Sequence, residues 1–360
     1  MEPEVKWRSI EELIDDIEPP SEDWRQRARR RLDTLTKPLG SLGRLEDLAA
    51  QVAAIRGERL SESGSKAVYV FAADHGVTEE GVSAYPREVT RQMVLNFLAE
   101  GAAINVLTRH HRARLHVVDV GVDADFGSTP GLLHRKVRGG TRNMLREAAM
   151  NEDEVEQALR VGYQLGLEAA AAGHVLIAIG EMGIGNTTAA SAVTCALTGA
   201  TARLATGHGT GVEFAAYANK VRVVEAAVAR HWGSFTGSRP RDILRSLGGL
   251  EIAAMAGMVL AGARHHLVVV LDGFISTAAA ALAAAIAPNA LGYLIAGHRS
   301  EEPGHKLLLD HLQLTPVLSL GMRLGEGTGA VLAMPVFESA IALYHQMTTF
   351  GAAGVSEATP

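Results

Sequence analysis

Six short runs of consecutive apolar residues constrain the fold of this chain more than any other feature. They are rich in Val, Ile, Leu and aromatic residues, and they occupy 67–73, 115–120, 174–179, 267–271, 290–296 and 316–320. A strand that is exposed on one face alternates apolar and polar residues, whereas a strand buried on both faces is apolar throughout. We therefore expect six strands in a sheet that is covered on both sides.

Helical stretches separate these predicted strands. They are expected at 87–110, 151–172, 187–198, 209–231, 248–264, 274–287 and 328–347. Strands that alternate with helices are joined by crossover connections, so the pattern predicts an α/β fold with a parallel sheet and helices on both faces. A chain of 360 residues, 47% of them hydrophobic, is long enough for one large domain or two.

Both ends of the chain fall outside this alternation. The segment 9–56 is helical and charged, with a break at 37–43, and no strand follows 328–360. We predict a small helical domain built from 1–60 and 330–360, and an α/β catalytic domain built from 61–329.

Composition excludes several classes of protein. A net charge of −6, with acidic and basic residues interleaved, argues against a nucleic-acid partner or a membrane surface. The longest apolar stretch, 274–288, is mostly alanine and too short to span a bilayer, and the acidic N-terminus is unlike a signal peptide. The single cysteine, Cys195, suits a reducing compartment and a place in the core. We expect a soluble, cytoplasmic protein.

The residues that follow each strand should form the site, because ligands of open parallel sheets bind beyond the carboxyl ends of the strands. Each predicted strand is followed by glycine, by a polar group or by both, and these groups are Asp74-His75-Gly76, Asp119-Val120-Gly121, Gly180 to Gly183, Asp272-Gly273, Gly297 to Ser300, and Gly321. Turns alone would account for the glycines. They account less well for four carboxylates at these ends.

The segment 180–188 joins a strand to a helix, and its glycines allow backbone N–H groups to approach an anion at the helix N-terminus. It resembles a phosphate cradle but has neither the lysine of a P-loop nor a dinucleotide fingerprint. A helix cap without a ligand is the alternative. Two weaker candidates of the same kind are 207–211, with Lys220 further along, and 300–306.

Other candidates carry less information. Asp74 and His75 resemble a pair of metal ligands, but no second cluster supports them, and we assign neither a metal nor a cofactor. Gln92 and Met93 lie on a helix that could line an apolar pocket, although core packing is favoured for Met93. The long basic loop 122–143 is either functional or a solvated connection.

Glu326 is the sharpest feature, because it stands between glycines in the sequence Gly325-Glu326-Gly327-Thr328-Gly329. At the start of a helix its carboxylate would satisfy free N–H groups, which lowers its pKa. If it points into a dry pocket instead, desolvation raises its pKa toward that of a working base. The residues alone leave both readings open.

At these positions the chain resembles the nicotinate-nucleotide–dimethylbenzimidazole phosphoribosyltransferases over nearly its whole length. The ordered matches are 37–43, 74–77, 83–86, 89–93, 101–105, 140–144, 180–188, 207–211, 272–274, 300–305 and 325–329. Two departures are Ala148, where proline is expected, and His208, where arginine is common.

The resemblance implies a Rossmann-like parallel sheet, a homodimer and a reaction. In that reaction 5,6-dimethylbenzimidazole displaces nicotinate from nicotinate mononucleotide, giving α-ribazole 5′-phosphate for cobalamin. It assigns Glu326 as the catalytic base. It assigns the aromatic base to Tyr85, Gln92, Glu181, Met182 and Leu324. It assigns the ribose phosphate to Gly183, Gly185, Asn186, Thr187, Thr188, Gly209, Lys220, Ser300, Glu302 and His305.

Two rival functions use the same glycine turns. A phosphosugar hydrolase or isomerase would need a metal or an acid and base pair near Asp74 and His75. A non-catalytic nucleotide-binding protein would bind without turnover.

Overall fold

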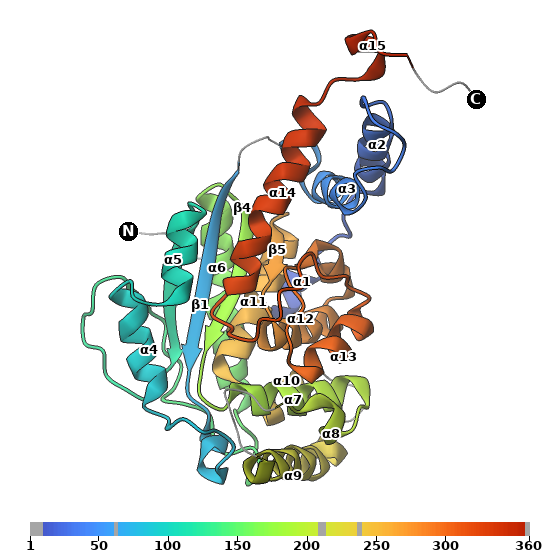
Figure 1. Ribbon diagram of the computed structural model, residues 1–360. Coiled ribbons are helices and arrows are strands. Elements are labelled where there is room, and N and C mark those ends of the chain that lie inside the picture. The colour runs from blue at the N-terminus through green and yellow to red at the C-terminus, as the bar shows by residue number, and fades with distance from the viewer. Residues whose placement is uncertain (1–9, 61–63, 208–213, 236–239, 357–360) are drawn as a thin grey trace.

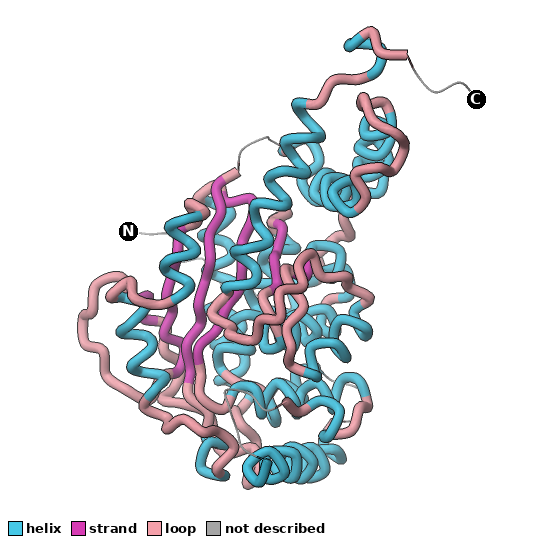
Figure 2. Tube along the Cα trace, in the orientation of Figure 1, coloured by secondary structure: helices cyan, strands magenta, loops and turns pink. Residues whose placement is uncertain are grey.

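The structure is a computed structural model, and it describes residues 10–60, 64–207, 214–235 and 240–356. A six-stranded sheet forms its centre, and every pair of neighbouring strands is parallel. The strands are β1 (Ser65–Ala73), β2 (Arg114–Gly121), β3 (Leu132–His134), β4 (His174–Met182), β5 (Val268–Leu271) and β6 (Leu294–Ala296). Their spatial order is β3-β2-β1-β4-β5-β6, so the predicted Rossmann-like α/β fold is confirmed (Figure 2).

Most of the helices connect or cover these strands. In chain order they are α4 (Val89–Leu98), α5 (Ala103–His110), α6 (Glu152–Ala171), α7 (Asn186–Thr198), α8 (Ala202–Ala205), α9 (Phe214–His231), α10 (Pro240–Leu247), α11 (Leu250–Arg264), α12 (Phe274–Ile286), α13 (Pro303–Leu312) and α14 (Thr328–Gln346). Helices α4, α5 and α14 lie on one face of the sheet, and α6 and α11 lie on the other (Figure 1). Residues 250–263 of α11 are all buried, because this helix lies between the sheet and α6.

Two predicted elements are wrong in detail. The run 316–320 is not a strand, since only Leu318 forms an isolated bridge, with His298, and Leu320 is exposed. The first half of 290–296 is part of a 3-10 helix (Pro288–Tyr293), and β6 begins only at Leu294. The sixth strand is instead β3, which lies inside the predicted loop 122–143.

The predicted helix 87–110 is divided in two. Helix α4 ends at Leu98 and α5 begins at Ala103. Between them Glu100 adopts a left-handed conformation, with φ 59°, which an α-helix cannot contain.

A helical arm projects beyond the sheet (Figure 1). It contains α2 (Glu22–Asp33), α3 (Arg44–Arg56) and the end of α14, and α1 (Ile10–Ile14) and α15 (Phe350–Ala353) flank it in the chain. Arg31 Nε and Nη2 donate to the carbonyls of Tyr344 (2.8 Å) and His345 (3.1 Å) at the end of α14. The predicted domain boundary at 329/330 falls in the first turn of α14, which contacts both β4 and α3. Helix α14 therefore belongs to both the helical arm and the sheet region, and the division into two domains stays a prediction.

Candidate active site

A cavity of about 340 Å³ opens at the carboxyl ends of the strands. Twelve of the residues predicted for the site line it. They are Tyr85, Glu181, Met182, Gly183, Gly185, Asn186, Thr187, Lys220, Ser300, Glu302, Leu324 and Glu326. These residues come from separate parts of the chain, and the parallel sheet brings them together because its strands all end at the same edge.

Glu326 lies in a buried turn immediately before α14. Its side chain is 6% exposed, and its Oε2 accepts a hydrogen bond from the Ile104 N–H (3.4 Å) at the start of α5. Burial raises the pKa of the Glu326 carboxyl, the Ile104 N–H opposes this effect, and the nearby Asp272 adds to it. The pKa rises rather than falls, so the cavity environment outweighs any helix-cap effect at this position.

Close packing against strand β4 fixes the position of the Glu326 turn. A Cβ atom on Gly180, in β4, would lie 2.5 Å from the Glu326 carbonyl carbon and from the Gly327 nitrogen. Only glycine at position 180 therefore allows the turn to rest on the strand. The backbone of Glu326 is consequently held against the sheet while its side chain faces the cavity.

A second carboxyl, Glu181, lies beside the turn at the end of β4. Its Oε2 accepts a hydrogen bond from the Asn186 side-chain amide, and its Oε1 packs against Gly325. Burial raises the pKa of Glu181 to about 8, and the carboxyls of Asp272, Glu251 and Glu326 add to this shift. Glu181 is therefore mainly protonated at neutral pH, and Glu326 is the better candidate for a base.

Apolar side chains form one group of lining residues, which is called here the apolar side of the cavity. Met182 follows Glu181, and Tyr85, Met93 and Leu324 complete the wall. Tyr85 and Leu324 are each about half exposed, so this wall reaches the surface. Met93 was expected in the core but lines the cavity. Gln92 is exposed on α4 and does not line it, so its binding role stays a prediction.

A second group of lining residues is polar, and it is called here the polar side of the cavity. Lys220, on α9, is 1% exposed, and its Nζ donates to Thr187 Oγ1 (2.8 Å) in the first turn of α7. Burial lowers the pKa of Lys220 to about 8, and Glu302 opposes this shift. Ser300 and Glu302 complete this side. A buried ammonium beside a helix N-terminus is a suitable place for a phosphate.

Of the described residues predicted for the ribose phosphate, Thr188 and His305 do not line the cavity. Gly209 and its neighbour His208 lie outside the described residues. Thr188 is fully buried, behind Thr187. His305 lies behind Ser300, and its Nδ1 accepts the Ser300 N–H (2.9 Å).

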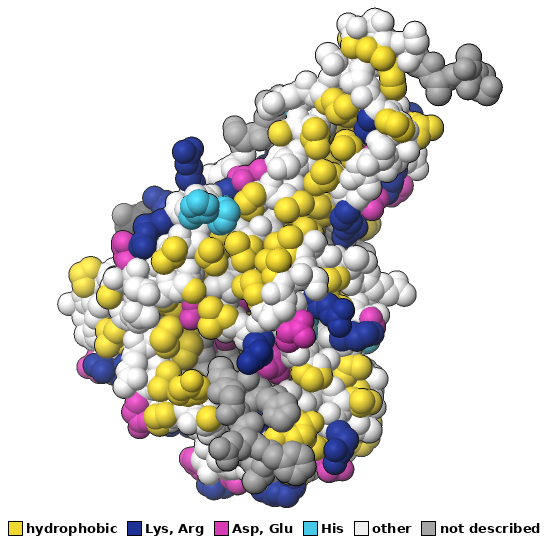
Figure 3. Space-filling view, viewed as in Figure 1, with side chains coloured by type: hydrophobic (Ala, Val, Ile, Leu, Met, Phe, Trp, Pro, Cys, Tyr) yellow, Lys and Arg dark blue, Asp and Glu magenta, His cyan; other side chains and the backbone are white. Residues whose placement is uncertain are grey.

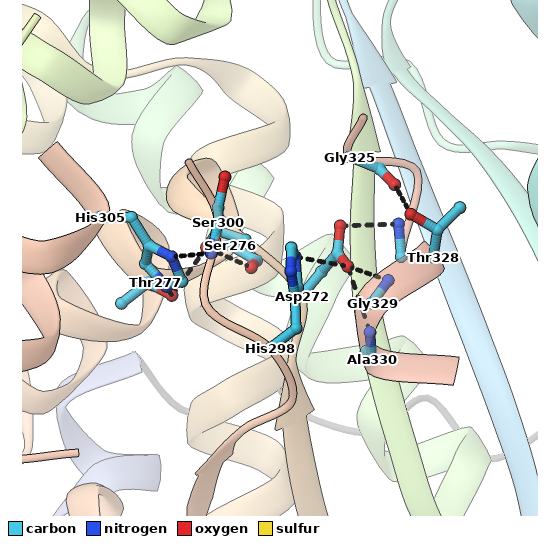
Figure 4. A network of polar contacts seen from close by, with 12 residues as sticks. Asp272, Ser276, Thr277, His298, Ser300, His305, Gly325, Thr328, Gly329 and Ala330 are labelled. Carbon is cyan, nitrogen blue, oxygen red and sulfur yellow. Dashed lines mark hydrogen bonds and ion pairs between the residues drawn. The ribbon is translucent and has the colours of Figure 1, made fainter. Parts of the chain in front are cut away.

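His305 is held in one tautomer. Since Nδ1 accepts a hydrogen bond, Nε2 carries the hydrogen and donates to Thr277 Oγ1 (3.1 Å), whose hydroxyl donates to the Gly273 carbonyl (2.7 Å). Burial lowers the pKa of His305 to about 3, so the ring is neutral. These contacts, shown in Figure 4, suit a residue that positions the Ser300 turn rather than one that binds an anion directly.

Sequence reasoning gave no role to Asp272, His298 or Arg323. Asp272 follows β5, is 2% exposed, and accepts three backbone N–H groups at the start of α14. His298 follows β6 and lines the cavity, with its Nε2 3.7 Å from Asp272 Oδ1. Arg323 lines the cavity beside Leu324. The signals in the sequence were the positions of Asp272 and His298 directly after strands and, for Asp272, its place in the matched segment 272–274.

Asp74 and His75 serve the structure of their loop. His75 Nε2 lies 2.5 Å from Glu251 Oε1, and both side chains are buried. Asp74 Oδ2 accepts the Asp123 N–H (2.8 Å). Within the described residues, no three His, Cys, Asp or Glu side chains gather into a group able to hold a metal ion. None of the residues 122–143 lines the cavity.

Comparisons with known proteins cover nearly the whole chain. A family model described as phosphoribosyltransferase matches residues 17–355. Proteins named nicotinate-nucleotide–dimethylbenzimidazole phosphoribosyltransferase are 49% identical in Geobacter sulfurreducens and 51% identical in Chloroflexus aggregans. Each alignment covers 97% of this chain and 98% of the relative.

A solved structure with a similar fold comes from the same family. The crystal structure of CobT from Thermus thermophilus has a TM-score of 0.89 and 48% sequence identity, over 93% of this chain and all of that one. No helix in the described part of the chain has the length and apolar character that a membrane crossing requires.

Proposed function

Because the chain belongs to the nicotinate-nucleotide–dimethylbenzimidazole phosphoribosyltransferase family, we propose that it catalyses the reaction for which these relatives are named. It transfers the 5-phosphoribosyl group of nicotinate mononucleotide to 5,6-dimethylbenzimidazole. The products are nicotinate and α-ribazole 5′-phosphate, a precursor of the lower ligand of cobalamin. The observation that carries the proposal is the buried Glu326 carboxyl between an apolar wall and a cationic pocket.

The two sides of the cavity match the two parts of the reaction. Benzimidazole is flat and apolar, and it fits the wall formed by Tyr85, Met93, Met182 and Leu324. The ribose phosphate is anionic, and it fits the side formed by Lys220, Thr187 and Ser300. In this placement the ribose carbon C1′ lies between the two sides, near the Glu326 turn.

The reaction requires one proton transfer. One ring nitrogen of dimethylbenzimidazole attacks C1′ with its lone pair, while the bond from C1′ to the nicotinate nitrogen breaks and its electron pair returns to the pyridine ring. The other ring nitrogen of dimethylbenzimidazole loses its proton to Glu326. The raised pKa of Glu326 makes it a stronger base than an exposed carboxylate. The leaving nitrogen becomes neutral and needs no acid.

Attack from the face opposite the leaving group inverts C1′, so the β-linked substrate gives an α-linked product. Because both reactants are held in one cavity, most of the remaining rate enhancement comes from positioning. His305 contributes here by fixing the Ser300 turn.

Nicotinate mononucleotide carries a second anion, the ring carboxylate. Among the described residues that line the cavity, Arg323 is the cation next to Leu324 and the Glu326 turn, and it makes no ion pair with any described residue. We assign Arg323 to the nicotinate carboxylate and Lys220 to the phosphate. This assignment accounts for two anionic groups with two cations that line one cavity.

We further propose that the protein acts in the cytoplasm as a homodimer. Large apolar side chains are exposed on the arm, on α5 and beside the cavity, at Leu39, Val106, Leu320 and Leu324. Figure 3 shows apolar side chains gathered over α14 and the elements beside it. Such surfaces are typical of interfaces, and a second copy is the expected partner. Light scattering should give twice the mass of one chain, and a monomer at assay concentration would contradict the homodimer.

The experiment measures release of nicotinate from nicotinate mononucleotide, with and without dimethylbenzimidazole, in the presence of a chelator. We expect release only when both substrates are present, and no effect of the chelator. Release without the aromatic base would indicate a hydrolase. Binding of the nucleotide without release would indicate a non-catalytic nucleotide-binding protein.

A further inference from the structure

The turn that carries Glu326 is strained. Gly325, Glu326 and Gly327 all have left-handed backbone conformations, with φ of 86°, 63° and 87°. For a residue with a side chain, such as Glu326, this conformation costs about 1 kcal/mol. Strain of this kind persists at functional sites only where the surrounding structure holds it in place. Contacts from neighbouring residues must therefore stabilise the left-handed conformation of this turn.

Local contacts hold only part of it. The Thr328 hydroxyl donates to the Gly325 carbonyl (2.8 Å), and Gly180 supports the peptide from below. The first N–H groups of α14 still need acceptors, because the N-cap residue, Gly327, has no side chain to supply one. Because glycine cannot accept these N–H groups, a side chain from another part of the chain must do so.

Asp272 performs this task from the end of β5. Its Oδ2 accepts the Gly327 N–H (3.1 Å), and its Oδ1 accepts those of Gly329 (2.6 Å) and Ala330 (3.1 Å). Figure 4 shows the carboxylate between these N–H groups and His298. Both oxygens act as acceptors, which is the arrangement of an ionised carboxylate. One side chain therefore ties the strained turn to the centre of the sheet.

We propose that Asp272 is a positioning residue for the reaction, which holds the Glu326 turn in its left-handed conformation and places a fixed negative charge behind the base. The inference rests on the proposed function, since it concerns the residue assigned as the base. It assigns Asp272 no contact with substrate: Asp272 does not line the cavity, and it acts through Glu326.

The charge distinguishes this role from ordinary helix capping. A serine or threonine would also accept N–H groups, but it would leave the proton affinity of Glu326 unchanged. Burial raises the pKa of Asp272, while His298 and the three N–H groups oppose that rise. The Asp272 charge in turn raises the pKa of Glu326.

Other charged groups face Glu326 from each neighbouring element, and a pH profile must be read with them in view. Glu181 lies at the end of β4, His298 follows β6, and Arg323 precedes the turn. Lys220 and Glu302 also line the cavity. Asp272 differs from all of these because it also bonds to the turn itself.

The test compares Asp272→Asn with the wild-type protein in steady-state kinetics across pH. Asparagine has nearly the same shape but carries no charge. We expect kcat to fall about 10- to 100-fold, with less than about a threefold change in KM for nicotinate mononucleotide. Without the negative charge Glu326 stays ionised to lower pH, so the acid limb of the kcat profile should move down by about one pH unit.

Asp119→Asn is the matched control. Asp119 lies at the end of β2, is equally buried and accepts the Val122 N–H (2.9 Å), but it is remote from the Glu326 turn in the sheet order. This variant should lose stability without any shift of the acid limb. A loss of kcat in Asp272→Asn with the limb unmoved would reduce Asp272 to a structural cap and overturn the proposal, as would unchanged kinetics.

A variant that fails to fold is also informative. If Asp272→Asn does not fold, Asp272→Ser gives the same expectations with a smaller neutral side chain. Failure of both to fold would show that Asp272 serves the whole fold, which also overturns the proposal. Absence of turnover in the wild-type protein would instead contradict the proposed function, so the two failures are separable.

Discussion

A cavity lies at each end of the sheet, and the two cavities differ in whether their buried charged side chains form ion pairs. The cavity at the amino ends of the strands is larger, about 670 Å³, and basic, lined by Lys66, His110, His111, Arg112, Arg114 and His174 with one carboxylate, Glu338. Its buried cation is neutralised, because Lys66 Nζ lies 2.5 Å from Glu338 Oε1. Its arginines are exposed to solvent.

The cavity at the carboxyl ends is about 340 Å³, and three of its ionisable side chains are buried without an ion pair to a described residue, whereas Arg323 is exposed. Glu181, Glu326 and Lys220 are each at most 8% exposed, and burial shifts the pKa of each toward the neutral form. Burying a charged group costs free energy, so shifted groups mark functional sites more reliably than cavity size does. For this reason we propose the smaller cavity as the active site.

The largest effect is expected at the base. Glu326→Gln should lower kcat by about 100- to 1,000-fold, because the proton of dimethylbenzimidazole loses its acceptor, with little change in KM. Initial rates of nicotinate release measure it. Glu147→Gln, at an exposed position outside the cavity lining, is the control and should keep full activity. Equal loss in both variants would remove Glu326 from the mechanism.

The second effect concerns stability. The pKa of Glu181 rises from an ordinary 4.5 to about 8 on folding, so the folded protein binds this proton more tightly than the unfolded chain. The free energy of unfolding must then fall as pH rises from 4.5 to about 8. Glutamine cannot ionise, so Glu181→Gln should lack this pH dependence. Between about pH 5 and about pH 9 the wild-type protein should lose about 4 kcal/mol more of its free energy of unfolding than the variant does.

Urea unfolding at both pH values measures this difference. Glu147→Gln is the control, because the Glu147 side chain is 65% exposed. If wild type and Glu181→Gln have the same pH dependence, the carboxyl is not held in its neutral form, and the contrast between the two ends of the sheet weakens.

A smaller effect is expected at Arg323, the cation assigned to the nicotinate carboxylate. Arg323→Met should lower kcat/KM for nicotinate mononucleotide about tenfold and leave that for the neutral-ring analogue, nicotinamide mononucleotide, almost unchanged. The ratio of the two substrates is the readout. Arg299→Met, exposed and outside the cavity lining, should keep the wild-type ratio. Equal losses for both substrates would contradict the pairing of Arg323 with the ring carboxylate.

The smallest effect is expected at the amino end. Lys66→Met removes the cation of that cavity but leaves Glu338, whose side chain is 44% exposed, in contact with water. We expect less than about a twofold change in kcat/KM and a loss of about 1 kcal/mol in the free energy of unfolding. A large loss of activity with normal stability would show that the larger cavity also takes part in function.

The fold was predictable where a buried strand appears in the sequence as a continuous run of apolar residues. Strands β1, β2, β4 and β5 are buried apolar runs, and each was predicted within three residues of its ends. The three-residue β3 is too short to leave a pattern and lies in a basic loop. The run 316–320 has the composition of a strand, but it is an extended surface segment with a single bridge.

The convergence of the candidate residues on one cavity was predictable for a different reason. Residues after strands converge at one edge of a parallel sheet, and the family resemblance selected among them. Sequence gave no means to tell Ser300, which lines the cavity, from His305, which lies behind it, because both belong to one turn. Nor does sequence reveal that Asp272 caps a helix 55 residues further along the chain, since that contact exists only in three dimensions.

The central claim is that Glu326 and the two sides of the carboxyl-end cavity carry out one inverting transfer. Proton NMR of the purified product of nicotinate mononucleotide and dimethylbenzimidazole tests it directly, through the configuration at C1′. An α-linked riboside phosphate, formed by the wild-type protein and nearly absent with Glu326→Gln, is the expected result. A β-linked product, or free ribose 5-phosphate in its place, would contradict the claim.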